Sequence, residues 1–486
     1  MPAVCRAFLF SVVAVVLAAS PAGGAWTPPA TISAPHAFIG GVYGENMMLA
    51  SGAAGVLATW TFEDGFGPRA VTGANEAMAP PGGAFGAERH LPQAYASGPI
   101  VAMGGGRVVQ LILTPAGANQ SSMAIAIGDV SGRFGQPIAV PGRAFARRAT
   151  VAGNGLGDVL VSWIAADSHG QHRSVWASVR FAGGRFANAV RLATGLRTEQ
   201  VRAAIGRDRR MVVAFDSRIG ALFARVRNAR GAWSRTWRLG PAAVGTENDV
   251  SAFVGDFGEV VVAWYHTQLC EGGCESPGYT DVAVKPAGSS RFVAAHQLEF
   301  DRHGLAGAPS GRSLAPVVIS VPWFAPVIAF LVAGPARAGA PATSPAVVKV
   351  AYPTGAGWGP RGGGYTPPRA LSSPDGHASG LAGAAGRVGL LLTWIDAEPP
   401  DYVEGTIFAA TTGLRLPSPF GAPEQVSQGE RVVGATPVFN PATRWPASGL
   451  VSPWTLVWTS SSGVGTARET VLRASSPVCP PDPICS

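Results

Sequence analysis

The chain of 486 residues contains 64 Gly and 41 Pro, and 47% of its residues are hydrophobic. This apolar content excludes an extended disordered chain, so the Gly and Pro residues are expected in the tight turns of a protein with many short strands. Charged residues make up 14% of the chain, the net charge is +8, and no dense run of Arg or Lys occurs. The charge pattern therefore excludes a nucleic-acid-binding footprint and favours contact with anionic surfaces such as cell-envelope polymers.

The first 25 residues have the pattern of a secretory signal peptide. Arg6 precedes an apolar run at residues 7–19, and small residues follow at 20–25. The apolar run is shorter than the ~20 residues that a membrane-spanning helix needs. We therefore expect cleavage before Trp26, with an uncleaved anchor as the alternative. The mature protein is then secreted or extracytoplasmic, in the periplasm or at the cell surface, with no membrane span.

One pattern recurs along the rest of the chain: a Gly or charged residue, a β-branched apolar run, and an aromatic residue. The steps between successive copies are 49 to 66 residues, which is near the repeat length of β-propeller blades. Six copies are clear and two are weaker. The clear copies end at Trp60, Trp163, Phe215, Trp264, Trp394 and Trp458, and the weaker ones end at Leu113 and Phe330.

Three more strand-like segments surround each run, as in residues 201–239, and four strands form one propeller blade. The runs are continuously apolar, as expected for strands covered on both faces. We therefore predict an all-β fold, a β-propeller over residues 26–475 with eight four-stranded blades. Seven blades is the alternative, because residues 307–350 are irregular and rich in Pro.

The two ends of the propeller predict how the ring closes. Residues 26–33 resemble the fourth strand of a blade but precede the first complete repeat. The last repeat ends with residues 471–475 and lacks a fourth strand. We therefore expect the N-terminal strand to complete the last blade, which removes two exposed sheet edges. Residues 476–486 are a tail rich in Pro and Cys.

The repeats resemble those of exported bacterial β-propellers of the sialidase-like or WD40-like kind, at the level of blade architecture. The resemblance implies a disc with a central channel. The sharper motifs of these families are missing. The stretch 167–176 lacks the spacing of the Asp box S-x-D-x-G-x-T-W, and no G-H…W-D pairs occur.

Four cysteines follow the signal peptide, and an even number in an exported chain predicts disulfides. Three pairings are possible, and we favour the two local ones, Cys270–Cys274 and Cys479–Cys485. Each bond closes a very short loop, so it stabilises that loop more than the fold. A zinc site of four thiolates is the alternative, but these spacings suit zinc poorly. We expect no metal and no cofactor.

The sequence contains no G-x-S-x-G, H-E-x-x-H or phosphate-binding loop motif, so no catalytic residue is assigned. Acidic or polar residues do recur just after the aromatic that ends each run. In a propeller these positions lie at the face that usually binds ligands. They predict a polar rim around the channel mouth, unless the acids only stabilise turns. The rim residues are Glu63, Asp64, Asp167, Asp216, His266, Asp396 and Glu398.

We expect the recurring Trp and Phe residues to pack between blades as core, with sugar stacking as the alternative. The sequence thus predicts an exported, non-catalytic binding or scaffold propeller, most simply a monomer. Its partner is a glycan, an envelope polymer or another protein, and not nucleic acid. The alternative is a carbohydrate-active enzyme, a sialidase-like or other glycosidase, that uses carboxylates of the rim.

Overall fold

The computed structural model contains β-strands and turns and no helix in the part of the chain that it describes. That part is residues 29–34, 36, 38–39, 48–52, 55–64, 71–80, 83–91, 100–104, 106–116, 119–145, 148–167, 169–170, 172–196, 198, 200–217, 220–241, 249–267, 277–293, 295–301, 315–319, 326–333, 346–354, 364–386, 389–397, 405–413, 419–427, 431–439, 454–462 and 469–475. Within it, no helix is long and apolar enough to cross a membrane.

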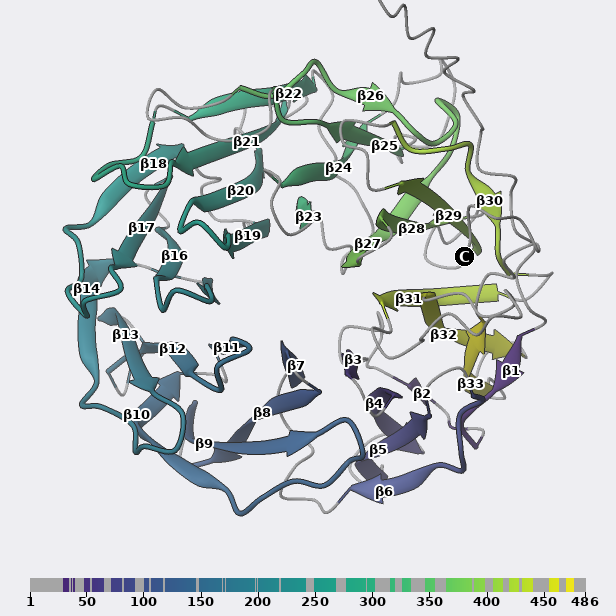
Figure 1. Cartoon of the computed structure of the whole chain (residues 1–486), viewed down its shortest axis with the longest axis horizontal. Helices are drawn as coiled ribbons and strands as arrows, with labels where there is room; N and C mark the ends of the chain where they lie inside the picture. Colours follow the sequence, from purple (N-terminus) through teal and green to yellow (C-terminus); the bar gives the residue numbers. More distant parts are fainter. Residues whose placement is uncertain are drawn as a thin grey trace, which may run out of the picture.

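The strands form seven antiparallel sheets around a central opening (Figure 1). In the second to sixth sheets the first strand in sequence lies nearest the opening, and the later strands lie farther out. The first three sheets contain β2 (Phe38–Ile39), β3 (Met48–Gly52), β4 (Gly55–Asp64), β5 (Val71–Ala79) and β6 (Arg89–Leu91); β7 (Ile100–Gly104), β8 (Arg107–Pro115), β9 (Gln120–Asp129) and β10 (Ile138–Phe145); and β11 (Ala149–Gly153), β12 (Val159–Ala165), β13 (Arg173–Arg180) and β14 (Val190–Leu196).

The next three sheets repeat the four-stranded arrangement, as the sequence predicts for propeller blades. They contain β15 (Val201–Ile205), β16 (Met211–Ser217), β17 (Ala221–Arg227) and β18 (Trp237–Pro241); β19 (Asp249–Val254), β20 (Val260–Thr267), β21 (Gly278–Lys285) and β22 (His296–Asp301); and β23 (Val317–Ile319), β24 (Val327–Ala333), β25 (Ala346–Ala351) and β26 (Arg369–Ala370). The irregular region 307–350 therefore contributes to a complete sheet.

The predicted number of eight blades is wrong, because the hydrogen bonding gives seven, which was the alternative. The seventh sheet has eight strands and contains the repeats of both Trp394 and Trp458. Main-chain pairing of Gly405 with Val432 joins the two repeats into one sheet. Its strands are β27 (Ala378–Gly386), β28 (Gly389–Ala397), β29 (Gly405–Gly413), β30 (Glu424–Gln425), β31 (Arg431–Phe439), β32 (Trp454–Ser462), β33 (Glu469–Ser475) and β1 (Ala30–Thr31).

The N-terminal strand closes the ring as predicted. β1 pairs antiparallel with β33, Ala30 opposite Ala474 and Thr31 opposite Arg473. The first and last described strands therefore belong to one sheet, so main-chain pairing closes the ring (Figure 1).

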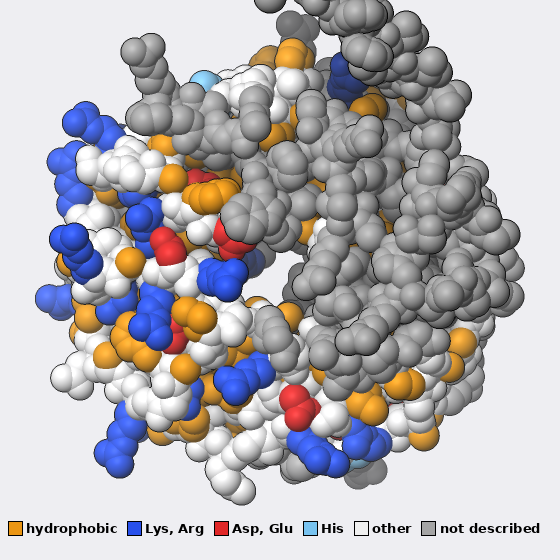
Figure 2. Space-filling model, in the orientation of Figure 1, with side chains coloured by type: hydrophobic (Ala, Val, Ile, Leu, Met, Phe, Trp, Pro, Cys, Tyr) orange, Lys and Arg blue, Asp and Glu red, His pale blue; other side chains and the backbone are white. Residues whose placement is uncertain are grey.

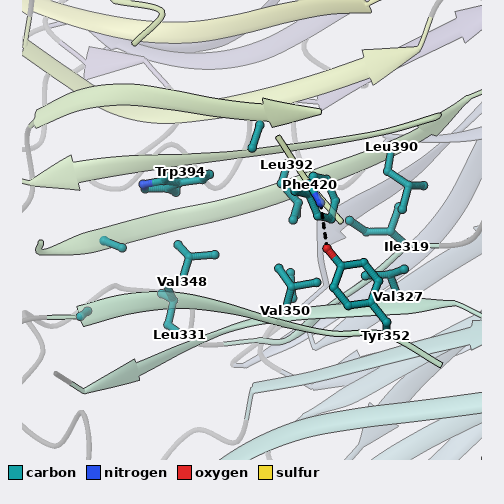
Figure 3. Packing of buried hydrophobic residues seen from close by; sticks show 14 of the residues in the cluster. Ile319, Val327, Leu331, Val348, Val350, Tyr352, Leu390, Leu392, Trp394 and Phe420 are labelled. Carbon is teal, nitrogen blue, oxygen red and sulfur yellow. Dashed lines mark hydrogen bonds between the residues drawn. The ribbon is translucent and has the colours of Figure 1, made fainter. Parts of the chain in front are cut away.

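The aromatic residues that end the apolar runs form the core between neighbouring repeats, as predicted. Trp60, Trp163, Trp264, Trp394 and Trp458 are each at most 2% exposed. Each packs against the preceding repeat: Trp264, for example, lies in one cluster with residues of the fourth sheet. Figure 3 shows the same arrangement for Trp394, which packs with β24 and β25 of the sixth sheet. There the hydroxyl of Tyr352 accepts a hydrogen bond from the Phe420 backbone N–H at 3.0 Å.

The outer strands make room for these indoles with glycines at bulges. β10 shifts register between Val140 and Arg143, and Gly142 lies in this bulge with φ of 109°. A Cβ atom on Gly142 would lie 2.7 Å from Cζ2 of Trp163, in the next sheet. Gly240 of β18 lies in the same way over Trp264.

We expect Gly142→Ala to destabilise the fold by about 2–4 kcal/mol, because it adds a core overlap to an unfavourable positive φ. Gly183→Ala is the matched control. Gly183 also has a positive φ, 73°, but an added Cβ there would meet nothing within 4 Å. Chemical unfolding of both variants measures the difference, and equal losses would show that the packing against Trp163 does not matter.

The two ends of the ring differ in their connections. The first and second strands of a sheet, and the third and fourth, are joined at one end, which we call the turn face. The second and third strands, and successive sheets, are joined at the other end, which we call the loop face. Contacts agree with this assignment, since the Ala182 N–H of a third-to-fourth connection donates to Asp158 of a first-to-second connection.

Candidate functional site

The loop face carries a pocket of about 460 Å³ between the second and third sheets. Its walls come from β9 and β10 on one side and from β12, β13 and their connection on the other. It lies above the bulge at Gly142, where the outer strand of one sheet meets the indole of the next. The lining residues are Gln120, Gly142, Arg143, Phe145, Trp163, Ala165, Ala166, Asp167, His172, Ser174, Trp176 and Ala189.

Three aromatic side chains give the pocket its apolar surface. Trp163 is buried, whereas Phe145 and Trp176 are partly exposed. The Trp176 indole donates a hydrogen bond to the Ser174 hydroxyl at 2.8 Å. The guanidinium group of Arg173 lies 4.9 Å from the centre of the Phe145 ring, within the range of a cation–π contact. These contacts hold Trp176 and Phe145 in fixed positions.

Polar groups surround the aromatic surface. The Asp167 carboxylate accepts hydrogen bonds from the backbone N–H groups of His169 at 3.1 Å and His172 at 3.3 Å, which fix its place in the loop. The Arg143 guanidinium is exposed and lies 3.4 Å from the side-chain oxygen of Gln120. The pocket thus combines a flat apolar surface with a few positioned donors and acceptors, which is the usual composition of a small-molecule site.

Of the predicted rim residues, Asp167 lies in this pocket and four others have partners elsewhere. Asp64 ends β4, is 45% exposed and lies 3.0 Å from Nδ1 of His36. Asp216 is buried in β16 and accepts a hydrogen bond from the Gln200 N–H.

His266 is buried in β20, with Nε2 2.9 Å from a carboxylate oxygen of Asp281, and its ring stacks on Tyr279. Asp396 of β28 accepts a hydrogen bond from the His377 N–H at 2.6 Å. Glu63 lies in β4, opposite Thr72 of β5. Glu398 lies outside the described residues. Ligand binding by the predicted rim therefore remains a prediction.

The predicted signal peptide, tail and disulfides Cys270–Cys274 and Cys479–Cys485 also lie outside the described residues. Among the residues that are described, no group of three or more His, Cys, Asp and Glu side chains has an arrangement that could hold a metal ion.

The sequence did not single out Arg143, Phe145 or Trp176. One signal for Trp176 was available, because it lies directly opposite Trp163 across β12 and β13. No comparable signal marks Arg143 and Phe145, since they come from a different sheet and meet Trp176 only after the blades pack.

Comparison with known proteins gives distant likenesses. No family model matches the chain, and no curated protein matches it. Among solved structures, the chain is similar to the β-propeller domain of the trilobed protease of Pyrococcus furiosus, with 10% identity, 76% of this chain and 90% of that chain covered, and a TM-score of 0.37. The chain is also similar to a fucose-specific lectin from Aleuria aurantia, with 12% identity, 80% of this chain and 98% of that chain covered, and a TM-score of 0.36. A third similar structure is a neuraminidase-like protein from A/bat/Guatemala/164/2009, with 8% identity, 95% of this chain and 93% of that chain covered, and a TM-score of 0.34. The strands and register described above identify the chain as a β-propeller independently of these likenesses.

Proposed function

We propose that this protein is an extracytoplasmic carbohydrate-binding propeller whose binding site is the pocket between the second and third sheets. The observation that carries the proposal is the pairing of the partly exposed Phe145 and Trp176 rings with Asp167 and Arg143 around one pocket. The predicted signal peptide supports a location outside the cytoplasm, where glycans are abundant.

The chemistry of a sugar ring suits this arrangement. A pyranose has an apolar face of C–H groups that packs on an aromatic ring, and hydroxyls at its edge that need donors and acceptors. Phe145 and Trp176 supply the apolar contact. Asp167 can accept from two hydroxyls, and the Arg143 guanidinium and Gln120 amide can donate. The loop already holds Asp167 through two backbone N–H groups, so binding orders little that was free.

We propose binding in preference to hydrolysis because Asp167 is the sole carboxylate among the described residues that line the pocket. Glycosidases use two carboxylates about 5–10 Å apart. The enzyme remains the alternative, and the experiment below includes an arm for it.

The test is binding of the purified chain from Trp26 onward to a glycan array, followed by calorimetry with the best sugar. Trp176→Ala and Asp167→Asn are each expected to weaken binding about tenfold or more, equivalent to about 1.4 kcal/mol. Trp233→Ala and Asp129→Asn are matched controls from the turn face, expected to change affinity less than twofold. Unchanged binding in the pocket variants would refute the proposed site.

The same sugar is also incubated with catalytic amounts of the protein, and new reducing ends are measured. No release is expected. Turnover that is lost in Asp167→Asn and retained in Asp129→Asn would replace the binding proposal with the glycosidase alternative.

A further inference from the structure

The positive charge of the protein gathers on the turn face of the second to fifth sheets. The connections on that face contain twelve Arg and Lys residues but only five Asp and Glu, a net charge of +7 against +8 for the whole chain. They are residues 104–107, 129–137, 154–158, 180–189, 206–210, 227–236, 255–259 and 285–293. Figure 2 shows many more basic than acidic side chains over the blades at the left and bottom of the ring.

The opposite face of the same sheets has no such excess. At the strand ends and turns described there, Arg143, Arg148, Arg173 and Arg202 balance Asp167, Asp216, Asp249 and Asp301. The excess charge therefore belongs to one face, and composition alone does not account for it.

Most acids on the turn face are already engaged within it. Asp158 pairs with Arg209 at 3.0 Å, and Asp208 pairs with Arg210 at 3.1 Å. The Glu259 carboxylate folds back over Gly255 in its own turn, and burial raises its pKa. These carboxylates therefore do little to neutralise the arginines that point to solvent.

Seven exposed arginines on this face have no ion-pair partner among the described residues: Arg107, Arg133, Arg185, Arg207, Arg230, Arg235 and Arg291. They come from four successive sheets. Two lie in connections between first and second strands, and five lie in connections between third and fourth strands. Charges spread this widely suit an extended polyanion better than a single small anion. Arginine in particular binds carboxylates and other oxyanions through two parallel hydrogen bonds.

The aromatic residues of the face distinguish between polyanions. Proteins that bind single-stranded nucleic acid stack successive bases on exposed aromatic rings. Here two guanidinium groups already lie against Phe181, those of Arg209 at 5.0 Å and Arg227 at 5.4 Å from the ring centre. Phe257 is the large aromatic of this face that the described structure leaves exposed, and one ring is no platform for a series of bases.

We infer that the turn face of the second to fifth sheets binds an acidic polysaccharide through its arginines. This site lies on the opposite face from the sugar pocket and does not depend on it, so one propeller can hold two chains of an envelope or matrix at once. The attraction is electrostatic, so it falls as the salt concentration rises.

The test compares polygalacturonate with its fully methyl-esterified form, which has the same backbone without the charge. Polygalacturonate is expected to bind, and the ester is not. Arg207→Gln/Arg230→Gln/Arg291→Gln is expected to weaken binding roughly tenfold, since each exposed ion pair contributes modestly. The matched control Arg202→Gln/Arg238→Gln/Arg369→Gln removes the same charge from exposed positions elsewhere and is expected to change affinity less than threefold.

Three outcomes would overturn the inference: equal binding of the acid and its ester, equal loss in the two triple variants, or tighter binding of a DNA duplex that depends on the same three arginines. The Trp176→Ala variant separates this site from the sugar pocket, because it is expected to bind polygalacturonate normally whether or not the pocket binds a sugar.

Discussion

Replacing Trp264 with Ala is expected to lower the free energy of unfolding by about 3–5 kcal/mol, the usual cost of truncating a fully buried Trp. Trp264 has no exposed surface. It packs with Leu222 and Val226 of the preceding sheet, and its indole donates a hydrogen bond to the Pro241 carbonyl at 2.9 Å. The variant therefore leaves a cavity between two sheets and a carbonyl without its donor.

Trp237→Ala is the matched control, because Trp237 lies in β18 of the adjacent sheet but is only half-buried. Its truncation is expected to cost about 1–2 kcal/mol, since less apolar surface returns to water. Unfolding in urea, monitored by Trp fluorescence and circular dichroism, measures both variants. If the two variants lost the same stability, the burial of Trp264 between two sheets would not be what makes it important to the fold.

The positions of the core aromatics could be predicted because a local pattern determines them. A run such as Val260 to Trp264 is apolar at every position, which a strand tolerates only where both faces are covered. Repetition of that run near every 50 residues then indicates a propeller, and the unpaired segment before the first repeat indicates how the ring closes. Each of these inferences needs only neighbouring residues and their spacing.

The number of blades depends on contacts that no local pattern determines. Both repeats of the seventh sheet have the expected apolar run, with Trp394 in one and Trp458 in the other. They count as one sheet because Gly405 and Val432 pair through the main chain. Side chains hardly control such a pairing, so the sequence pattern could not anticipate it.

The sugar pocket and the basic face were hidden for a related reason. The pocket joins Phe145 of one sheet to Trp176 of the next, and the two residues are far apart in the sequence. The seven exposed arginines without an ion pair extend from Arg107 to Arg291, so no dense basic run marks them. The connections between strands alternate between the two ends of the ring. This alternation places the arginines together on the turn face and the pocket residues together on the loop face.

Asp158→Ala is expected to destabilise the protein by about 2–4 kcal/mol, because it removes a buried carboxylate that accepts three hydrogen bonds. The Asp158 carboxylate is fully buried. It accepts from the Ala182 N–H at 3.0 Å, from the Asn154 side-chain amide at 3.3 Å and from Nε of Arg209 at 3.0 Å. Asn154 and Ala182 belong to the third sheet and Arg209 to the fourth, so one side chain connects two blades.

The size of the loss depends on which donors can return to water. Arg209 is 47% exposed, so its guanidinium can be hydrated after Asp158 is removed, and this part of the loss is small. The Ala182 N–H and the buried Asn154 amide account for the rest. Asp208→Ala is the control, because the Asp208–Arg210 pair lies in a similar turn with Asp208 30% exposed, and its removal is expected to cost less than about 1 kcal/mol. Urea unfolding of both variants, with hydrogen exchange at Ala182, measures the difference. A loss in Asp208→Ala as large as in Asp158→Ala would show that surface charge, and not the buried hydrogen bonds, joins these blades.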